Sequence, residues 1–283
     1  MNNNTSSIDT TNKKRIYELD VLRAICIILM IIDHFTLFVD FSGGIGGWAS
    51  YLFSNYYEVN NRFIDSFVGI CHDFQYSILR DAGHYIVATI FLVLVGINCA
   101  FSRSNFKRSL KIGIAAIIIG IVTTALSLIS GEDLYIIFGV LSCLAVSILI
   151  ISVIEKFFPS KWLYLIVGII IVLWGFIIEW WAAPRIYYIT SLNFSSLVDI
   201  ILGFKVYGQD HFGLIPCTGV IFIGVFIGKT LYRKRKSLLP KLEGKWTVPF
   251  KFVSKLALLI YLVHQVVSVI LILLMYFIAG YRI

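Results

Sequence analysis

Charged residues are scarce in this sequence. Asp, Glu, Lys and Arg make up 14% of the 283 residues, whereas hydrophobic residues make up 59%. A soluble domain contains about 25% charged and about 45–50% apolar residues. This shortage of charge argues against a soluble domain and indicates an integral membrane protein.

Paired cysteines and internal repeats are absent. The five cysteines form no CxxC pair, and four of them lie in apolar runs. The sequence therefore predicts neither a disulfide framework nor a metal site. The lack of a visible repeat, and of matching helices broken by Pro or Gly, speaks against a transporter built from inverted halves.

Long apolar runs make up most of the chain. A helix needs about 20 apolar residues to cross a bilayer, and such runs occur at 21–40, 83–101, 110–130, 134–154, 162–181, 212–231 and 254–279. We predict an all-α integral membrane protein with a bundle of about seven transmembrane helices. Residues 15–283 would form one transmembrane domain, preceded by a disordered cytoplasmic tail over residues 1–14.

Two connections between these runs are long and rich in aromatic residues. They cover 41–82 and 182–211, and their composition is not that of disordered chain. We expect interfacial or re-entrant helices in both of these outer loops. Their aromatic side chains would form either a belt at the lipid headgroups or a surface on which sugars stack.

The basic residues are distributed unevenly between the two sides of the predicted bundle. The net charge is +8, which in a soluble protein would suggest nucleic acid. Here 19 of the 24 Lys and Arg residues fall on the side of the N-terminus. By the positive-inside rule the N-terminus is cytoplasmic and the C-terminus lies outside the plasma membrane. The expected partner is membrane lipid and not nucleic acid. The sequence is also compatible with a homo-oligomer.

Three ionisable residues interrupt the first apolar run. Arg23 and His34 are 11 residues apart, which places both on one face of a helix and about 16 Å apart along its axis. Asp20 is spaced to pair with Arg23. Asp33 points about 100° away from His34, so we expect it to pair with another helix. Ionisable residues this deep in a membrane usually mark functional sites.

The last apolar run contains a second deep histidine. His264 lies about as far from the cytoplasmic side as His34 if both helices enter from that side. The two histidines therefore predict a shared polar cavity inside the bundle. The alternative is that each is a structural histidine bonded to a neighbouring hydroxyl or carbonyl.

Other candidate residues lie at the ends of the predicted helices. Asp210 and His211 precede the sixth run, and a break at Pro216 would aim them at the cavity as substrate-side residues. Arg103, Lys107 and Arg108 lie on the cytoplasmic side. These basic residues either set the topology or hold a polyphosphate donor.

Several segments resemble one family in the same order along the chain. They are "RIYELDVLRAICIILMIIDHF", "IFLVLVGINCAFSRSNFKRSLK", "YIIFGVLSCLAVSILI", "DHFGLIPCTGVIFIGVFIGKTLY" and "LIYLVHQ". Together they are similar to the heparan-alpha-glucosaminide N-acetyltransferase catalytic-domain family in its short prokaryotic form. That family lies within the membrane acyltransferase superfamily. The chain departs from the family pattern at Ala24, where Gly is usual, and at Ser142, where many relatives have His.

The resemblance implies an acyl-CoA-dependent acyltransferase. No metal is expected, as the cysteine pattern already indicated. Acetyl-CoA or another acyl-CoA would bind on the cytoplasmic side, held by Arg23 and the basic residues near it. The acyl group would pass to an amine or hydroxyl of a cell-envelope glycan or glycolipid. His34 would act as the base or acyl carrier, with Asp33 and His264 as further catalytic candidates. Transfer through an acyl-histidine and direct transfer both remain open.

Two other functions fit parts of the sequence. A small-molecule or proton-coupled transporter would use Asp33, His34 and His264 as a proton relay. A non-enzymatic membrane component would keep them as a structural polar core. The spacing of Arg23 and His34 and the basic cytoplasmic loops favour the acyltransferase.

Overall fold

The structure is a computed structural model that describes residues 15–43, 47–130, 135–182, 194–207 and 210–282. The tail predicted for residues 1–14 lies outside the described residues. Helices dominate the described chain, which contains no β-strand. They are α1 (Tyr17–Ser42), α2 (Trp48–Leu52), α3 (Arg62–Gln75), α4 (Ile78–Phe101), α5 (Asn105–Ser130), α6 (Val140–Phe157), α7 (Lys161–Ala182), α8 (Phe194–Leu202), α9 (Leu214–Thr230), the 3₁₀ turn η2 (Pro240–Leu242), α10 (Thr247–Lys255) and α11 (Ala257–Ile278).

Each predicted apolar run has a helix in the structure. α1, α4, α5, α6 and α11 are long and apolar enough to cross a membrane. Two shorter apolar helices are Lys161–Ile177, within α7, and α9. The prediction of an all-α integral membrane protein is therefore confirmed.

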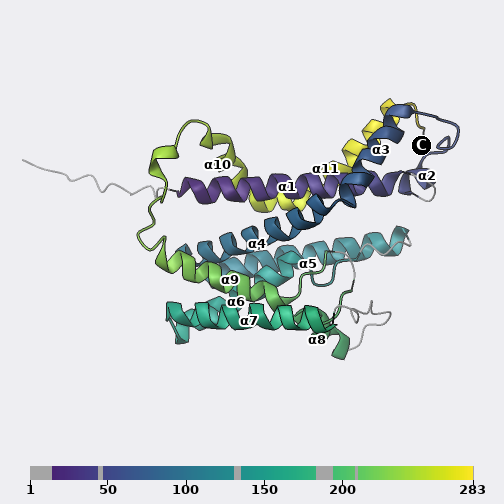
Figure 1. Cartoon of the computed structure of the whole chain (residues 1–283). Helices are drawn as coiled ribbons and strands as arrows, with labels where there is room; N and C mark the ends of the chain where they lie inside the picture. Colours follow the sequence, from purple (N-terminus) through teal and green to yellow (C-terminus); the bar gives the residue numbers. More distant parts are fainter. Residues whose placement is uncertain (1–14, 44–46, 131–134, 183–193, 208–209, 283) are drawn as a thin grey trace, which may run out of the picture.

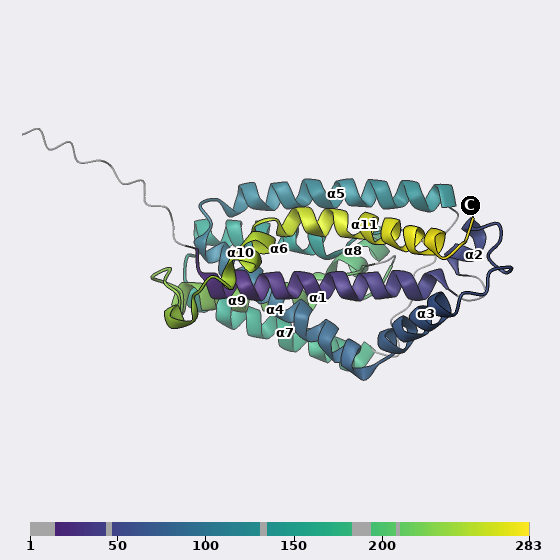
Figure 2. The same cartoon turned by 90° about the horizontal axis from the view of Figure 1, so that it is seen from above.

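The helices form two layers (Figure 1). The first layer consists of α1, α2, α3, α10 and α11, with α1 packed against the other four. The second layer runs from α4 to α9, and its closest packing joins α9 to α4 and α7, and α5 to α6. The layers meet mainly where α1 crosses α4, and Figure 2 shows the two helices crossing obliquely.

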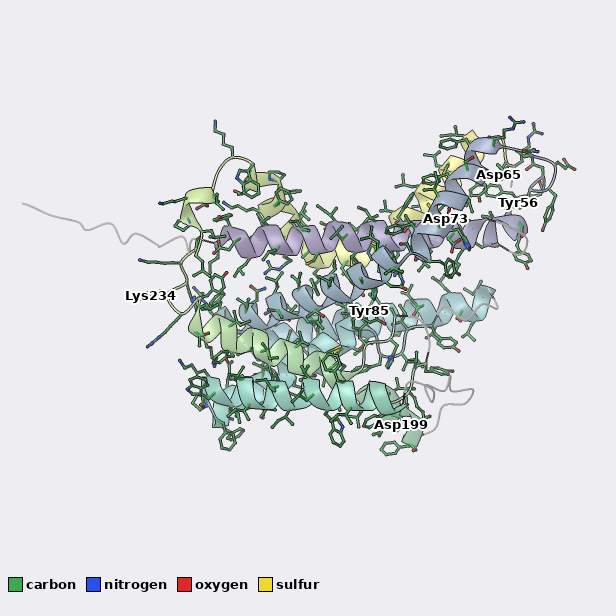
Figure 3. The ribbon with its side chains drawn as sticks, viewed as in Figure 1. Tyr56, Asp65, Asp73, Tyr85, Asp199 and Lys234 are labelled. Carbon is green, nitrogen blue, oxygen red and sulfur yellow. The ribbon has the colours of Figure 1, made fainter. Side chains whose placement is uncertain are left out.

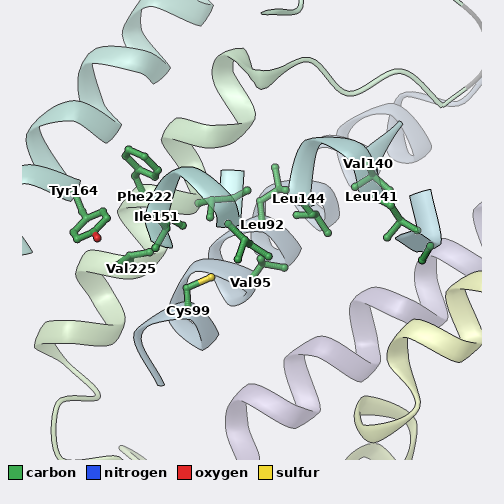
Figure 4. Close-up of a cluster of buried hydrophobic side chains, with 13 residues drawn as sticks. Leu92, Val95, Cys99, Val140, Leu141, Leu144, Ile151, Tyr164, Phe222 and Val225 are labelled. Carbon is green, nitrogen blue, oxygen red and sulfur yellow. The ribbon is translucent and has the colours of Figure 1, made fainter. Parts of the chain in front are cut away.

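A buried apolar cluster holds the second layer together (Figure 4). It joins Leu92 and Val95 of α4 to Ile151 of α6 and Val225 of α9. The close approach of α4 and α9 depends on Gly96, where an added methyl group would collide with the Ile221 carbonyl oxygen. Small residues at contact points let the backbones of membrane helices approach in this way.

Three predicted helix starts were wrong. α5 begins at Asn105, five residues before the predicted start at 110. α4 begins at Ile78, five residues before the predicted start, because the Ser77 hydroxyl accepts the Arg80 N–H and caps the helix. α6 begins at Val140, after the predicted start at 134. Residues 135–139 before it are not helical, and the Phe138 carbonyl accepts the Phe212 N–H at 3.1 Å instead of continuing a helix.

The two long connections contain short helices, as predicted. The first contains α2 and α3, and the second contains α8. Part of the aromatic content is core and not surface, because Phe53 stacks on Tyr276 with ring centroids 5.4 Å apart. Tyr51 and Tyr57 are exposed.

The two ends of the bundle differ in charge. α1 begins at the end from which Lys234 projects, whereas Asp65 and Asp73 lie towards the opposite end (Figure 3). We call the first the basic end and the second the far end.

Candidate active site

A cavity of about 780 Å³ lies between the two layers. Its walls are mostly apolar and come from α1, α4, α5 and α6, from the ends of α3 and α10 and the start of α11, and from the chain before α9. Its polar side chains form three groups. One lies towards the basic end, one around His34, and one where Asp33 faces α4.

Two histidines face each other beside the cavity. The rings of His34 on α1 and His264 on α11 have centroids 5.0 Å apart. His34 lines the cavity, while His264 is buried and does not line it. The ring contact confirms that the two residues lie at the same depth. The prediction of a polar cavity shared by both was wrong, because only His34 lines it and its walls are mostly apolar.

Backbone carbonyls fix the tautomers of both rings. Nδ1 of His34 lies 3.0 Å from the Met30 oxygen, and Nδ1 of His264 lies 2.8 Å from the Tyr261 oxygen. A carbonyl oxygen can only accept, so each Nδ1 carries the proton. In a neutral ring Nε2 then holds the lone pair. Nε2 of His264 is buried without a hydrogen-bond partner.

A tyrosine and an aspartate bridge the two layers next to this pair. The Tyr261 hydroxyl donates to Oδ2 of Asp210 at 3.0 Å, and both residues line the cavity. The backbone of Ile215 is non-helical, so the chain before α9 turns inward, as the nearby proline predicted. Burial raises the pKa of the Asp210 carboxyl, which lies outside the membrane helices.

His211 contacts the end of α8 and not the cavity. Its Nε2 lies 2.9 Å from the carbonyl oxygen of Ile200, and it does not line the cavity. Of the predicted pair, the structure brings Asp210 to the cavity and not His211.

Arginine and lysine side chains line the cavity near the basic end. They are Arg23, Arg108, Lys111 and Lys255. Arg23 donates to the Ser254 hydroxyl at 2.7 Å and pairs with Asp20 at 3.3 Å, which confirms the predicted Asp20 contact. Arg103 and Lys107 are exposed nearby and do not line the cavity, so their contact with a donor stays a prediction.

An ion pair joins α1 to α4 at the other side of the cavity. Asp33 pairs with Arg80 at 2.7 Å, and Nδ1 of His84 lies 3.5 Å from the same carboxylate. This confirms that Asp33 pairs with another helix. Arg80 belongs to the first turn of α4, because α4 begins at Ile78.

Comparison with known proteins identifies the family. The sequence profile described as Heparan-alpha-glucosaminide N-acetyltransferase, catalytic, matches residues 62–266. The chain belongs to this family. The family implies a membrane acetyltransferase, in agreement with the apolar helices. The matched region contains Arg80, Asp210 and His264, whereas α1 with Arg23 and His34 precedes it.

No curated protein matches the chain at the same stringency. No solved structure matches it either. The function is therefore inferred from the family and from the geometry of the site.

Among the polar residues that line the cavity, sequence reasoning missed Arg80, Lys255 and Tyr261 as site residues. Tyr261 carries a signal in the helical spacing, since it lies three residues before His264. Arg80 and Lys255 carry no such signal, because their positions depend on where helices start and end.

Proposed function

We propose that the protein transfers an acetyl group from acetyl-CoA to an amine or hydroxyl of a cell-envelope glycan or glycolipid. The observation that carries this proposal is the position of the His34–His264 pair. It lies beside one cavity that has cationic residues towards one end and a polar group on its other side. Transfer needs one catalytic group within reach of both a thioester and an acceptor.

The basic end suits the donor. CoA carries several phosphate charges, and arginine and lysine are the usual phosphate-binding side chains. Arg23 and His34 are separated by about 16 Å along α1, a length that the pantetheine arm can bridge. The phosphates could then stay near Arg23 and Arg108 while the thioester reaches His34.

The Nε2 lone pair of a neutral His34 suits the chemistry. As a general base it would take the proton of the acceptor amine or hydroxyl while that group attacks the thioester carbonyl. The carbon–sulfur bond would break, and the proton would pass to the leaving thiolate to give CoA. Alternatively, Nε2 would attack first and carry the acetyl group before the acceptor does. Both routes consume one acetyl-CoA and one acceptor and yield the same products.

Donor binding should stabilise the folded protein. We expect acetyl-CoA to raise the thermal unfolding temperature in detergent in a saturable way. Arg23→Ala and Arg108→Ala should weaken this response because each removes a cation from the cavity. Arg62→Ala is the matched control, since Arg62 is exposed on α3 and lies outside the cavity.

A folded protein that shows no shift with acetyl-CoA would count against the donor site. Free CoA and an unrelated nucleotide serve as ligand controls. A shift that Arg62→Ala weakens as much as Arg23→Ala would remove the cavity from donor binding. Lack of any response would favour the transporter.

The donor side should face the cytoplasm. The single domain over residues 15–283 would place its N-terminus inside and its C-terminus outside. A membrane-impermeant maleimide added to whole cells should label Asp65→Cys and leave Lys234→Cys unlabelled. Both positions are exposed, and they lie towards opposite ends of the bundle. The reverse labelling pattern would contradict this orientation.

A further inference from the structure

The cavity has a side opening between α1 and α4. Leu29 and Ile32 of α1 line the cavity but are 44% and 46% exposed, and Leu79 of α4 is 78% exposed. The two α1 residues lie in the middle of a 26-residue helix, so the part of their surface outside the cavity faces hydrocarbon in a bilayer. We define the side opening by Leu29, Ile32, Leu79 and Gly83.

Polar groups lie at the inner edge of the side opening. The Asp33–Arg80 ion pair joins α1 to α4 there, and His84 lies beside it with a side chain that is 42% exposed. Carboxylate oxygens and guanidinium N–H groups can bond sugar hydroxyls. The outer rim is apolar, since Leu29, Ile32 and Leu79 form it.

The side opening contains free space. A Cβ atom added at Gly83 would meet no other atom within 4 Å. Gly in a helix costs about 1 kcal/mol relative to Ala, so Gly83 gives up helix stability and leaves this rim open. Asp33 and His34 both line the cavity, so the side opening leads towards the proposed catalytic centre.

We propose that the acceptor is a sugar carried on a lipid, which reaches His34 from within the bilayer through the side opening. The proposal rests on the proposed acetyl transfer and deepens it. The sugar would contact the Asp33, Arg80 and His84 group, while its hydrocarbon chain stays in the membrane against Leu29, Ile32 and Leu79. A water-soluble glycan cannot use this route, because it would have to bring its hydroxyls through hydrocarbon.

The test compares two acceptors that carry the same amino sugar. Hexadecyl glucosaminide resides in the membrane, and methyl glucosaminide is water-soluble. Acetyl transfer to each is measured in proteoliposomes for the wild type, Gly83→Trp and Gly69→Trp. Gly69→Trp is the matched control, because a Cβ at Gly69 of α3 also meets no atom within 4 Å and Gly69 lies outside the cavity.

The kcat/KM ratio of the hexadecyl to the methyl acceptor decides the matter. We expect Gly83→Trp to lower this ratio about tenfold, because the indole ring fills the side opening. Gly69→Trp should leave it at the wild-type value. An unchanged ratio in Gly83→Trp would overturn the proposal.

A labelling experiment separates this proposal from the proposed function. A diazirine-bearing hexadecyl glucosaminide is photo-crosslinked, and the modified peptides are mapped. Labelling of the α1 and α4 peptides that is lost in Gly83→Trp and kept in Gly69→Trp supports the side opening, even if no transfer occurs. Transfer without such labelling would leave the acetyltransferase in place and reject the side opening.

Discussion

Replacing His34 with glutamine is expected to lower acetyl transfer by about a thousandfold, within the range that a lost general base produces. The glutamine amide can still donate to the Met30 carbonyl, which His34 contacts at 3.0 Å. It cannot accept and return a proton at neutral pH. Folding and acetyl-CoA binding should therefore be retained while turnover is lost.

His72→Gln is the control for this substitution. His72 lies on α3, its side chain is 57% exposed, and it pairs with Asp40 away from the cavity. Its replacement should leave turnover within about twofold of wild type, as expected of a surface change. If His34→Gln turned over as fast as the wild type and as fast as His72→Gln, His34 would have no part in the chemistry.

Replacing Asp33 with asparagine is expected to lower the free energy of unfolding by about 3 kcal/mol. Asp33 and Arg80 have side-chain exposures of 16% and 22%, and their contact lies within the membrane helices. The substitution would leave the Arg80 guanidinium without its close, partly buried counter-ion, because the remaining Asp81 carboxylate is 64% exposed and lies 3.5 Å away. Unfolding can be followed by denaturant titration in detergent micelles.

The double variant Asp33→Asn/Arg80→Gln tests the cause of that loss. Removing both charges should restore most of the stability, because no unpaired charge remains. Asp81→Asn serves as the control, since Asp81 also contacts Arg80 but its side chain is 64% exposed. A double variant less stable than Asp33→Asn would show that the ion pair is not the source of the effect.

Much of the fold followed from the sequence because bilayer thickness limits the choices. In lipid, an apolar run of about 20 residues must pair its own backbone N–H and C=O groups, and a helix is the main structure that does so. The meeting of His34 and His264 was also predictable. Both helices enter from one side, and the rise per residue sets the depth of each ring.

The remaining site residues depend on tertiary structure that the sequence does not display. Arg80 reaches Asp33 because Ser77 starts α4 early. Asp210 reaches Tyr261 because the chain is non-helical at Ile215 and lies against the segment before α6. Local capping and a break in one helix decided these contacts, and hydrophobic periodicity carries no information about either.

The sidedness of acetyl transfer tests the central claim most directly. Proteoliposomes are sorted by the orientation of the protein, acetyl-CoA is supplied to one side, and hexadecyl glucosaminide is supplied in the bilayer. We predict acetylated product only when the donor faces the basic end of the bundle, where Arg23 and Arg108 line the cavity. Product formed equally well with the donor at the far end would contradict a cavity that receives acetyl-CoA from one side of the membrane.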